Sequence, residues 1–128
     1  MRYHITPIPK PRMTRRDKWL KPPRNCVAQY RAFCDLCRIY RVDLRNGDSI
    51  KFVIPMPESW TQKKKLAMAG HLHQSKPDLS NLLKALEDAV HPDDDSELAW
   101  YSEIKKVWGA QGTIIITSAR PTPDDFPG

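Results

Sequence analysis

The sequence predicts one small α+β domain, in which helices pack on one face of a mixed β-sheet. Its 128 residues are enough for one hydrophobic core but too few for two. Hydrophobic residues make up 40% of the chain and charged residues 28%, a balance typical of globular rather than disordered proteins. Segments with helical and with alternating spacing follow one another without a regular βαβ order or an internal repeat. We therefore treat residues 1–128 as a single domain.

The first half of the chain is predicted to hold a short strand, a basic loop, a helix and a second strand. Residues 3–8, "YHITPI", form a strand candidate, whereas residues 10–24 are too rich in proline and charge for a regular element and predict an exposed basic loop. Apolar spacing predicts a helix over 26–38. Alternating stretches flank Asn46-Gly47, so a hairpin competes with a longer helix there. We favour a turn followed by a strand over 49–55.

The second half is predicted to hold two helices and two strands. Residues 57–70 indicate a short helix with a Ser or Thr cap and a glycine stop. The next helix should run from about 78 to about 90, because an Asp follows a proline at its start and a second proline follows its end. Residues 98–108 and 112–117 are predicted to be strands joined by the turn "GAQG". Residues 119–128 are expected to be a flexible tail.

Three cysteines are an odd number, and the N-terminus has no apolar segment typical of a secretory signal, so we expect reduced thiols. Cys34 and Cys37 form a CxxC, but helical spacing places both on the apolar stripe with Val27 and Tyr30. Core cysteines are therefore favoured over a zinc site, for which Cys26 would be the only nearby third ligand.

Positive charge is concentrated near the N-terminus of a chain whose net charge is +6. Residues 1–24 carry eight Lys or Arg and a single acid, Asp17, while the rest of the chain is close to neutral. Such a segment is typical of proteins that bind a polyanion. No run approaches the roughly 18 apolar residues of a membrane span, so we expect a cytoplasmic protein without a membrane partner.

The predicted helix over 78–90 has two distinct faces. At about 100° per residue its apolar side chains fill one arc, Asn81, Lys84 and Asp88 share another, and Asp78 lies at the helix mouth. The run Asp93-Asp94-Asp95 follows just beyond the far end. Clustered carboxylates repel one another unless a cation such as Mg²⁺ neutralises them, as in metal-dependent nucleases. The residues alone leave a second interpretation equally open, in which these acids only cap the helix and solubilise the surface.

The stretch "HQSKPDLSNLLKALEDAV", followed by "DDS" and "IKKVWG", resembles the RusA family of Holliday-junction resolvases. The family pattern is approximately HxxKPDxDNLxKAxxDAL, a short loop, and then DD before Ala or Ser. The segments "PKPRMTRRDKW" and "FVIPMPESW" are similar to those of phage and prophage members, and the likeness covers about residues 3–118.

The resemblance implies a metal-dependent endonuclease of bacterial or phage origin that resolves four-way DNA junctions by paired symmetric cleavage in recombination and repair, acting as a homodimer in the host cytoplasm. Mg²⁺, with Mn²⁺ as a substitute, would be the only cofactor. The implied catalytic residues are Asp78, Asn81, Lys84, Asp88 and Asp95, and the implied metal ligands are Asp78, Asp95 and its neighbour Asp94. DNA contacts are expected from the lead-in residues His73 and Lys76 and from the basic loop, at Lys10, Arg12, Arg15, Arg16, Lys18, Lys21 and Arg24. Trp19 in that loop either stacks on an unpaired base or, as we favour, pins the loop to the core.

Ser80 departs from the family pattern, which has a second aspartate at this position. A hydroxyl can hydrogen-bond water or cap the helix, but it supplies no negative charge for a metal. Two alternatives to an active resolvase therefore remain. One is a junction-binding protein of the same fold with impaired or lost cleavage, and the other is an unrelated basic module whose aspartates form a solvated loop.

Overall fold

A four-stranded mixed sheet forms the centre of the protein in a computed structural model that describes residues 1–12, 14–93 and 97–118. The strands are β1 (Arg2–Tyr3), β2 (Ser49–Pro55), β3 (Glu103–Gly109) and β4 (Thr113–Thr117), in the order β1-β4-β2-β3. Strand β2 pairs in parallel with β3 and antiparallel with β4. The predicted α+β class with a mixed sheet is confirmed.

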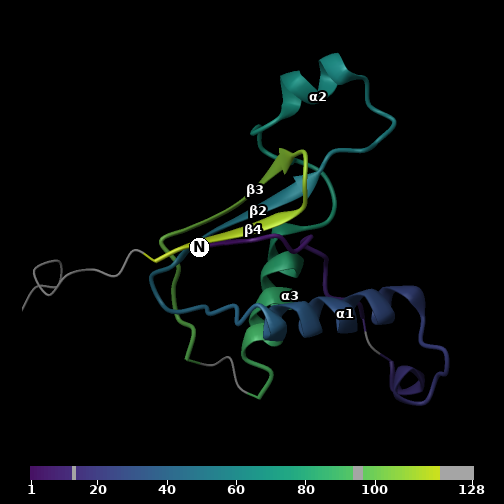
Figure 1. The fold of residues 1–128 in the computed structure, drawn as a ribbon. Helices are drawn as coiled ribbons and strands as arrows, with labels where there is room; N and C mark the ends of the chain where they lie inside the picture. The colour runs from purple at the N-terminus through teal and green to yellow at the C-terminus, as the bar shows by residue number, and fades with distance from the viewer. Residues whose placement is uncertain (13, 94–96, 119–128) are drawn as a thin grey trace, which may run out of the picture.

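Two helices, α1 (Asn25–Ile39) and α3 (Leu79–Val90), pack against each other and cover one face of this sheet (Figure 1). Alternate residues of the central strand, Ile50, Phe52 and Ile54, point into the core that the helices close. Helix α2 (Gln62–Met68) instead stands beyond the ends of β2 and β3 and buries none of its residues (Figure 1). The expectation that the helices pack on one face therefore holds for α1 and α3 and is wrong for α2.

The boundaries predicted for the helices and for β2 agree with the structure to within a few residues. The strand over 49–55 is confirmed, and a turn at Asn46-Gly47 precedes it, with Gly47 at a φ of 88°. Helix α2 begins after Thr61, whose hydroxyl accepts a hydrogen bond from the Lys64 amide, and stops before Gly70 at a φ of 83°. Among the described residues, none of the helices is long and apolar enough to cross a bilayer.

Strands β3 and β4 follow each other in sequence but are not neighbours in the sheet. Strand β2 lies between them, and residues 110–112 connect them across its end. The crossing is tight: a Cβ on Gly109 would lie 2.2 Å from Val53 Cγ1, and one on Gly112 would lie 2.7 Å from Thr6 Cα. Gly109 thus leaves room for the Val53 side chain and Gly112 for the Thr6 backbone, so these glycines allow close packing rather than a hairpin turn.

Strand β3 also starts later than predicted, at Glu103 instead of residue 98. The preceding residues are held by the turn before β2: Asn46 Oδ1 accepts hydrogen bonds from the amides of Ala99 at 2.5 Å and Trp100 at 3.2 Å. The Gly47 amide donates to the Trp100 carbonyl at 3.0 Å. These side-chain and turn contacts replace the ladder hydrogen bonds of a strand.

The N-terminal segment is less regular than predicted at its start and more regular in its loop. Strand β1 contains only two residues, because the Ile5 amide donates to the Tyr3 carbonyl at 2.8 Å and prolines follow at 7 and 9. The predicted irregular loop over 10–24 contains a short 3-10 helix at Arg15–Lys18. The predicted tail over 119–128 lies outside the described residues.

Candidate active site

Helix α3 presents the polar strip that its sequence predicts. Asp78 at the helix mouth and Asn81 and Lys84 along the strip are exposed and Asp88 is half-buried, whereas Leu82, Ala85 and Leu86 on a separate arc are buried in the core. The buried arc fixes the rotation of the helix, so the strip faces outward as one surface. Ser80 is exposed in the first turn, one residue from Asn81.

Asp78 occupies the N-cap position by its backbone but does not use its side chain as a cap. Its carbonyl accepts hydrogen bonds from the Asn81 and Leu82 amides, both at 3.1 Å, while its carboxylate makes no capping hydrogen bond. A carboxylate that is exposed and uncapped at the positive end of a helix has its oxygens available for a cation. A carboxylate of this kind is an oxygen ligand suited to a hard divalent metal.

The remaining predicted metal ligands, Asp94 and Asp95, lie outside the described residues. Within residues 1–12, 14–93 and 97–118, no three His, Cys, Asp or Glu side chains gather closely enough to hold a metal ion. The described part of the site thus supplies one acid at the mouth of α3.

Asp88 joins two lysines on the far part of the strip. Its carboxylate binds Lys10 Nζ through Oδ2, and Lys84 Nζ lies 3.3 Å from its Oδ1. Burial alone would raise the pKa of Asp88, but the hydrogen bonds from Lys10 and Lys84 outweigh it and lower the pKa. Since the Lys10 amide also approaches the Asn81 carbonyl at 3.4 Å, the start of the basic loop is fastened to α3.

A second acid organises the basic loop itself. Asp17 is 3% exposed and accepts paired hydrogen bonds from Arg24, at 2.7 Å from Nε and 2.6 Å from Nη2. Its Oδ2 also accepts hydrogen bonds from the Thr14 amide at 2.7 Å and the Thr14 hydroxyl at 3.0 Å. The Arg24 hydrogen bond and the Thr14 amide hold the pKa of Asp17 well below its usual range. The loop is therefore anchored from within, through a residue that the sequence analysis noted only as an isolated acid.

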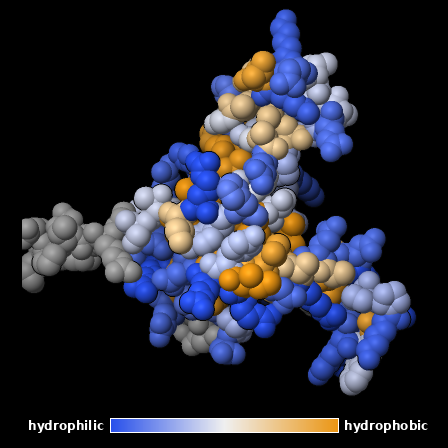
Figure 2. Space-filling view, viewed as in Figure 1, coloured by the Kyte–Doolittle hydropathy of each residue, from blue (hydrophilic) through white to orange (hydrophobic). Residues whose placement is uncertain are grey.

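The anchored loop displays most of the predicted DNA-binding cations on its outer surface. Lys10 and Arg24 already hold an acid, and the others are exposed: Arg12, Arg15, Arg16, Lys18 and Lys21. Figure 2 shows this hydrophilic region as a blue projection on the lower right of the molecule. Trp19 is 77% exposed, with Lys18 Nζ 5.7 Å from its ring centre. The favoured expectation that Trp19 pins the loop to the core is therefore wrong.

His73 does not lie where a DNA-contacting residue would lie. Its ring is 3% exposed and packs on Trp108 with the ring centres 4.1 Å apart. Burial, together with the charge of Lys106, lowers the pKa of His73, and within the described parts of the chain its buried Nδ1 has no hydrogen-bond partner. The expected contact between His73 and DNA therefore does not agree with this structure, whereas Lys76 is exposed as expected.

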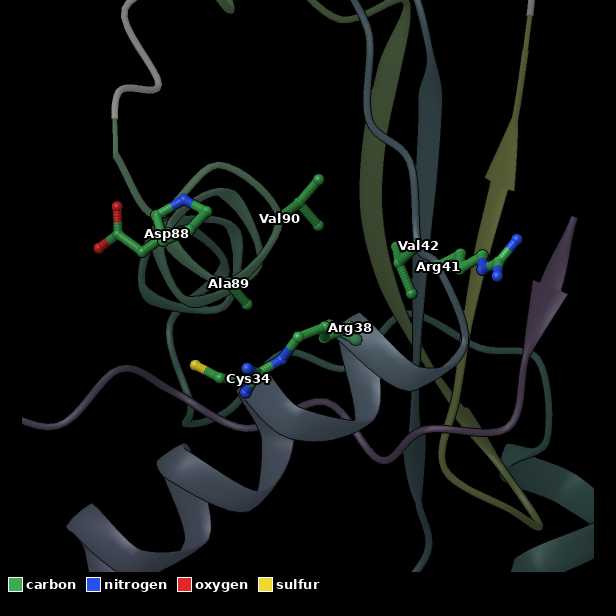
Figure 3. Close-up of a pocket in the computed structure, with 9 residues that line it drawn as sticks. Cys34, Arg38, Arg41, Val42, Asp88, Ala89 and Val90 are labelled. Carbon is green, nitrogen blue, oxygen red and sulfur yellow. The ribbon is translucent and has the colours of Figure 1, made fainter.

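The cysteines follow the core interpretation in part. Cys37 is buried, Cys34 is half-buried, and Cys26 is exposed; all three are free thiols. Cys34 and Cys37 line a hollow of about 360 Å³ between α1 and the end of α3. Figure 3 shows Cys34 and Arg38 of α1 facing Ala89 of α3 there. Burial raises the pKa of Cys34 and Cys37, so neither is an activated thiolate.

Sequence reasoning missed one residue that contacts the lead-in to Asp78. Lys106 Nζ donates to the Ser75 carbonyl and, at 2.6 Å, to the Pro77 carbonyl. The signal was present in the alternation of "IKKVWG", because Lys106 shares the helix-facing side of the strand with Ile104 and Trp108. A lysine whose side chain points to the helix-covered face of a sheet indicates that hydrogen-bond acceptors for its ammonium group lie on that face.

Comparison with known families agrees with this arrangement. Residues 4–117 match the family model described as endodeoxyribonuclease RusA, which covers strands β2, β3 and β4, the polar strip and the basic loop. Neither a curated protein nor a solved structure matches the chain. The match excludes the unrelated basic module that the sequence left open, and the chain belongs to the RusA family of Holliday-junction endodeoxyribonucleases.

Proposed function

We propose that this protein cleaves four-way DNA junctions by metal-dependent hydrolysis of phosphodiester bonds, in DNA recombination or repair. The observation that carries the proposal is the exposed carboxylate of Asp78, which is uncapped at the mouth of α3 and shares an outward surface with Asn81 and Lys84. Family membership supports the reaction class, and the anchored cations of the basic loop support a polyanionic substrate.

Asp78, together with Asp94 and Asp95 of the following loop, would hold Mg²⁺, or Mn²⁺ in its place. When bound, such an ion supplies a water polarised for attack and offsets the charge that develops on the phosphate. Asn81 lies one turn along from Asp78 and can orient a water or a phosphate oxygen through its amide.

Lys84 would bind the phosphate under attack, and Asp88 would direct it. The distance of 3.3 Å between Lys84 Nζ and Asp88 Oδ1 keeps the ammonium on the strip, while half of the side chain remains exposed to a ligand. Lys10 Nζ also binds Asp88, so the carboxylate that directs Lys84 is itself held in place. Asp88 is thus a positioning residue in this mechanism rather than a metal ligand.

Exposed cations of the basic loop would bind the DNA backbone beside the active site. Trp19 stands among them with 77% of its surface exposed, which suits stacking on an unpaired base at the branch point. Paired cuts in a two-fold symmetric junction need two active sites, so we propose that two copies of this chain act as a homodimer. We further propose that the chain is a phage or prophage member of the family.

A second candidate function is junction binding without cleavage, and Ser80 is the observation that favours it. Ser80 is exposed in the first turn of α3, where the family pattern has an acid. Loss of one anionic ligand weakens the hold on a divalent cation, while the binding surface of the loop remains unchanged.

One experiment separates these functions. The unmodified chain and the Ser80→Asp variant are incubated with a labelled four-way junction and with a linear duplex, in Mg²⁺, in Mn²⁺ and in EDTA. Paired nicks by the unmodified chain that disappear in EDTA support the resolvase, and cleavage by Ser80→Asp alone supports the binding protein. If neither protein cuts or prefers the junction, the proposed function is wrong. Sedimentation with and without the junction tests the homodimer.

A further inference from the structure

Lys106 occupies an unusual place for a charged side chain. It lies opposite Phe52 in the register of the parallel pair β2 and β3, so its side chain leaves the sheet on the side that α1 and α3 cover. The residue is half-buried. Removing an ammonium group from water costs free energy unless its protons find acceptors, so the environment of Lys106 must supply them.

Those acceptors are in the segment that leads into α3. Lys106 Nζ donates to the carbonyls of Ser75 and Pro77, and its own backbone carbonyl accepts a hydrogen bond from the His73 amide at 3.0 Å. A single residue of β3 therefore holds three alternate residues of the stretch 73–77. Residues 70–73 also run along the free edge of β3, where the Gly70 amide donates to the Trp108 carbonyl at 2.8 Å.

This attachment reaches Asp78 through one rigid unit. The Pro77 carbonyl and the Asp78 amide belong to the same planar peptide group, so fixing the first fixes the second. The next peptide group is fixed as well, because the Asp78 carbonyl accepts from the amides of Asn81 and Leu82. With both flanking peptides held, only the side-chain torsions of Asp78 remain free.

We propose that Lys106 is a positioning residue, which holds the segment 73–77 so that the Asp78 carboxylate is pre-oriented for a divalent cation. This inference rests on the proposed function, because that function assigns the cation to Asp78. Removing a group that orients a metal ligand without contacting the metal itself typically lowers metal affinity or activity by about 10–100-fold. Lys106 acts here on the backbone that carries the ligand.

Lys105 provides a matched control. It is the same residue type on the same strand, it points to the opposite side of the sheet, and its Nζ lies 3.4 Å from Glu103 Oε1. If Lys106 contributed only to general stability or net charge, replacing Lys105 would have the same effect as replacing Lys106. If Lys106 holds residues 73–77, replacing Lys105 would not have that effect.

The test compares the unmodified chain with Lys106→Met, Lys106→Arg and Lys105→Met. Methionine keeps an apolar stem without the ammonium, and arginine keeps the charge and the donors. Three quantities are measured on each protein: Mn²⁺ affinity from the electron paramagnetic resonance signal of free Mn²⁺, hydrogen exchange of the amides of His73, Asn81 and Leu82, which donate to Lys106 and Asp78, and junction affinity in EDTA. Thermal melts verify folding, and Lys106→Gln replaces the methionine variant if that variant does not fold.

We expect Lys106→Met to bind Mn²⁺ about 10–100-fold more weakly and to exchange the amides of His73, Asn81 and Leu82 faster. Lys106→Arg should recover most of both losses, and Lys105→Met should match the unmodified chain. Equal Mn²⁺ affinity and equal exchange in Lys106→Met and Lys105→Met would overturn the inference, and so would a loss confined to junction affinity, which would make Lys106 a DNA contact. If the unmodified chain binds Mn²⁺ without cutting junctions, cleavage is refuted but these comparisons still decide the role of Lys106; if it binds no Mn²⁺, both proposals fail.

Discussion

The salt dependence of DNA binding should report how many cations of the basic loop are available to phosphates. Five of the seven predicted contacts are exposed and outside the two ion pairs described above, whereas Lys10 and Arg24 are already neutralised by Asp88 and Asp17. Each phosphate neutralised contributes about −0.9 to the slope of log K against log salt, so the five loop contacts contribute about −4.5 per chain, beside the contributions of Lys76 and Lys84. On the loop's contribution alone, affinity should fall by about 500-fold between 50 and 200 mM salt.

Single substitutions make this count specific. Arg16→Gln removes an exposed cation and should make the slope less steep by about 0.9, so that affinity falls by only about 150-fold over the same range. Lys10→Met removes a cation that Asp88 already neutralises, and it should leave the slope nearly unchanged. The assay is fluorescence anisotropy of a labelled four-way junction in EDTA, with stoichiometry from sedimentation, because a dimer would double the absolute slope but not this comparison. An equal change of slope in the two variants would show that the ion pair opens on binding and would refute the count.

Three further results are expected. Since the pKa of Asp88 is lowered in the folded state, its ion pairs stabilise the protein above the unfolded pKa near 3.8 and lose that effect as pH falls through the folded value. Asp88→Asn should therefore lower the free energy of unfolding in urea by about 1 kcal/mol at pH 7 and by less at pH 3. An equal loss at both pH values would contradict the ion pairs. Gly112→Ala places a Cβ 2.7 Å from the Thr6 backbone and should lower the free energy of unfolding by about 1–3 kcal/mol or more, whereas Gly70→Ala should lower it by about 1 kcal/mol because of the positive φ alone. The reverse order of stability in thermal melts would refute the tight crossing. Iodoacetamide at pH 8 should label the exposed Cys26 in the native protein but the buried Cys37, with a pKa raised to about 12, only after unfolding, and mass spectrometry of digested protein distinguishes the two.

Periodicity predicted those parts of the structure that depend on one local pattern. Helix α3 has an apolar arc that must be buried, so its ends and its polar strip followed from residues 78–90. Strand β2 alternates between inward and outward positions over its whole length and was predicted at its observed bounds. Both elements are central to the core, and for such elements burial and local spacing agree.

Features that depend on contacts between distant segments were not predicted. Strands β3 and β4 are adjacent in sequence, but β2 separates them, and no local pattern distinguishes this order from a hairpin. His73 belongs to a motif that implied DNA contact, yet its ring is buried against Trp108 from a strand more than thirty residues away. The partner of a polar side chain in a folded chain is decided by tertiary packing, which spacing along the sequence does not contain.

The acids of this basic protein have different tasks because their surroundings differ. Asp17 is buried and saturated by Arg24 and Thr14, so it can only hold the loop. Asp88 is half-buried between two lysines, so its charge is already matched by theirs. Asp78 is the one of these three that is exposed and makes no capping hydrogen bond with its side chain, although its backbone is fixed on both sides. A metal ligand requires an uncommitted carboxylate on a rigid backbone. Substitutions at the residues that hold the backbone of Asp78 should therefore lower metal affinity before they lower the stability of the fold.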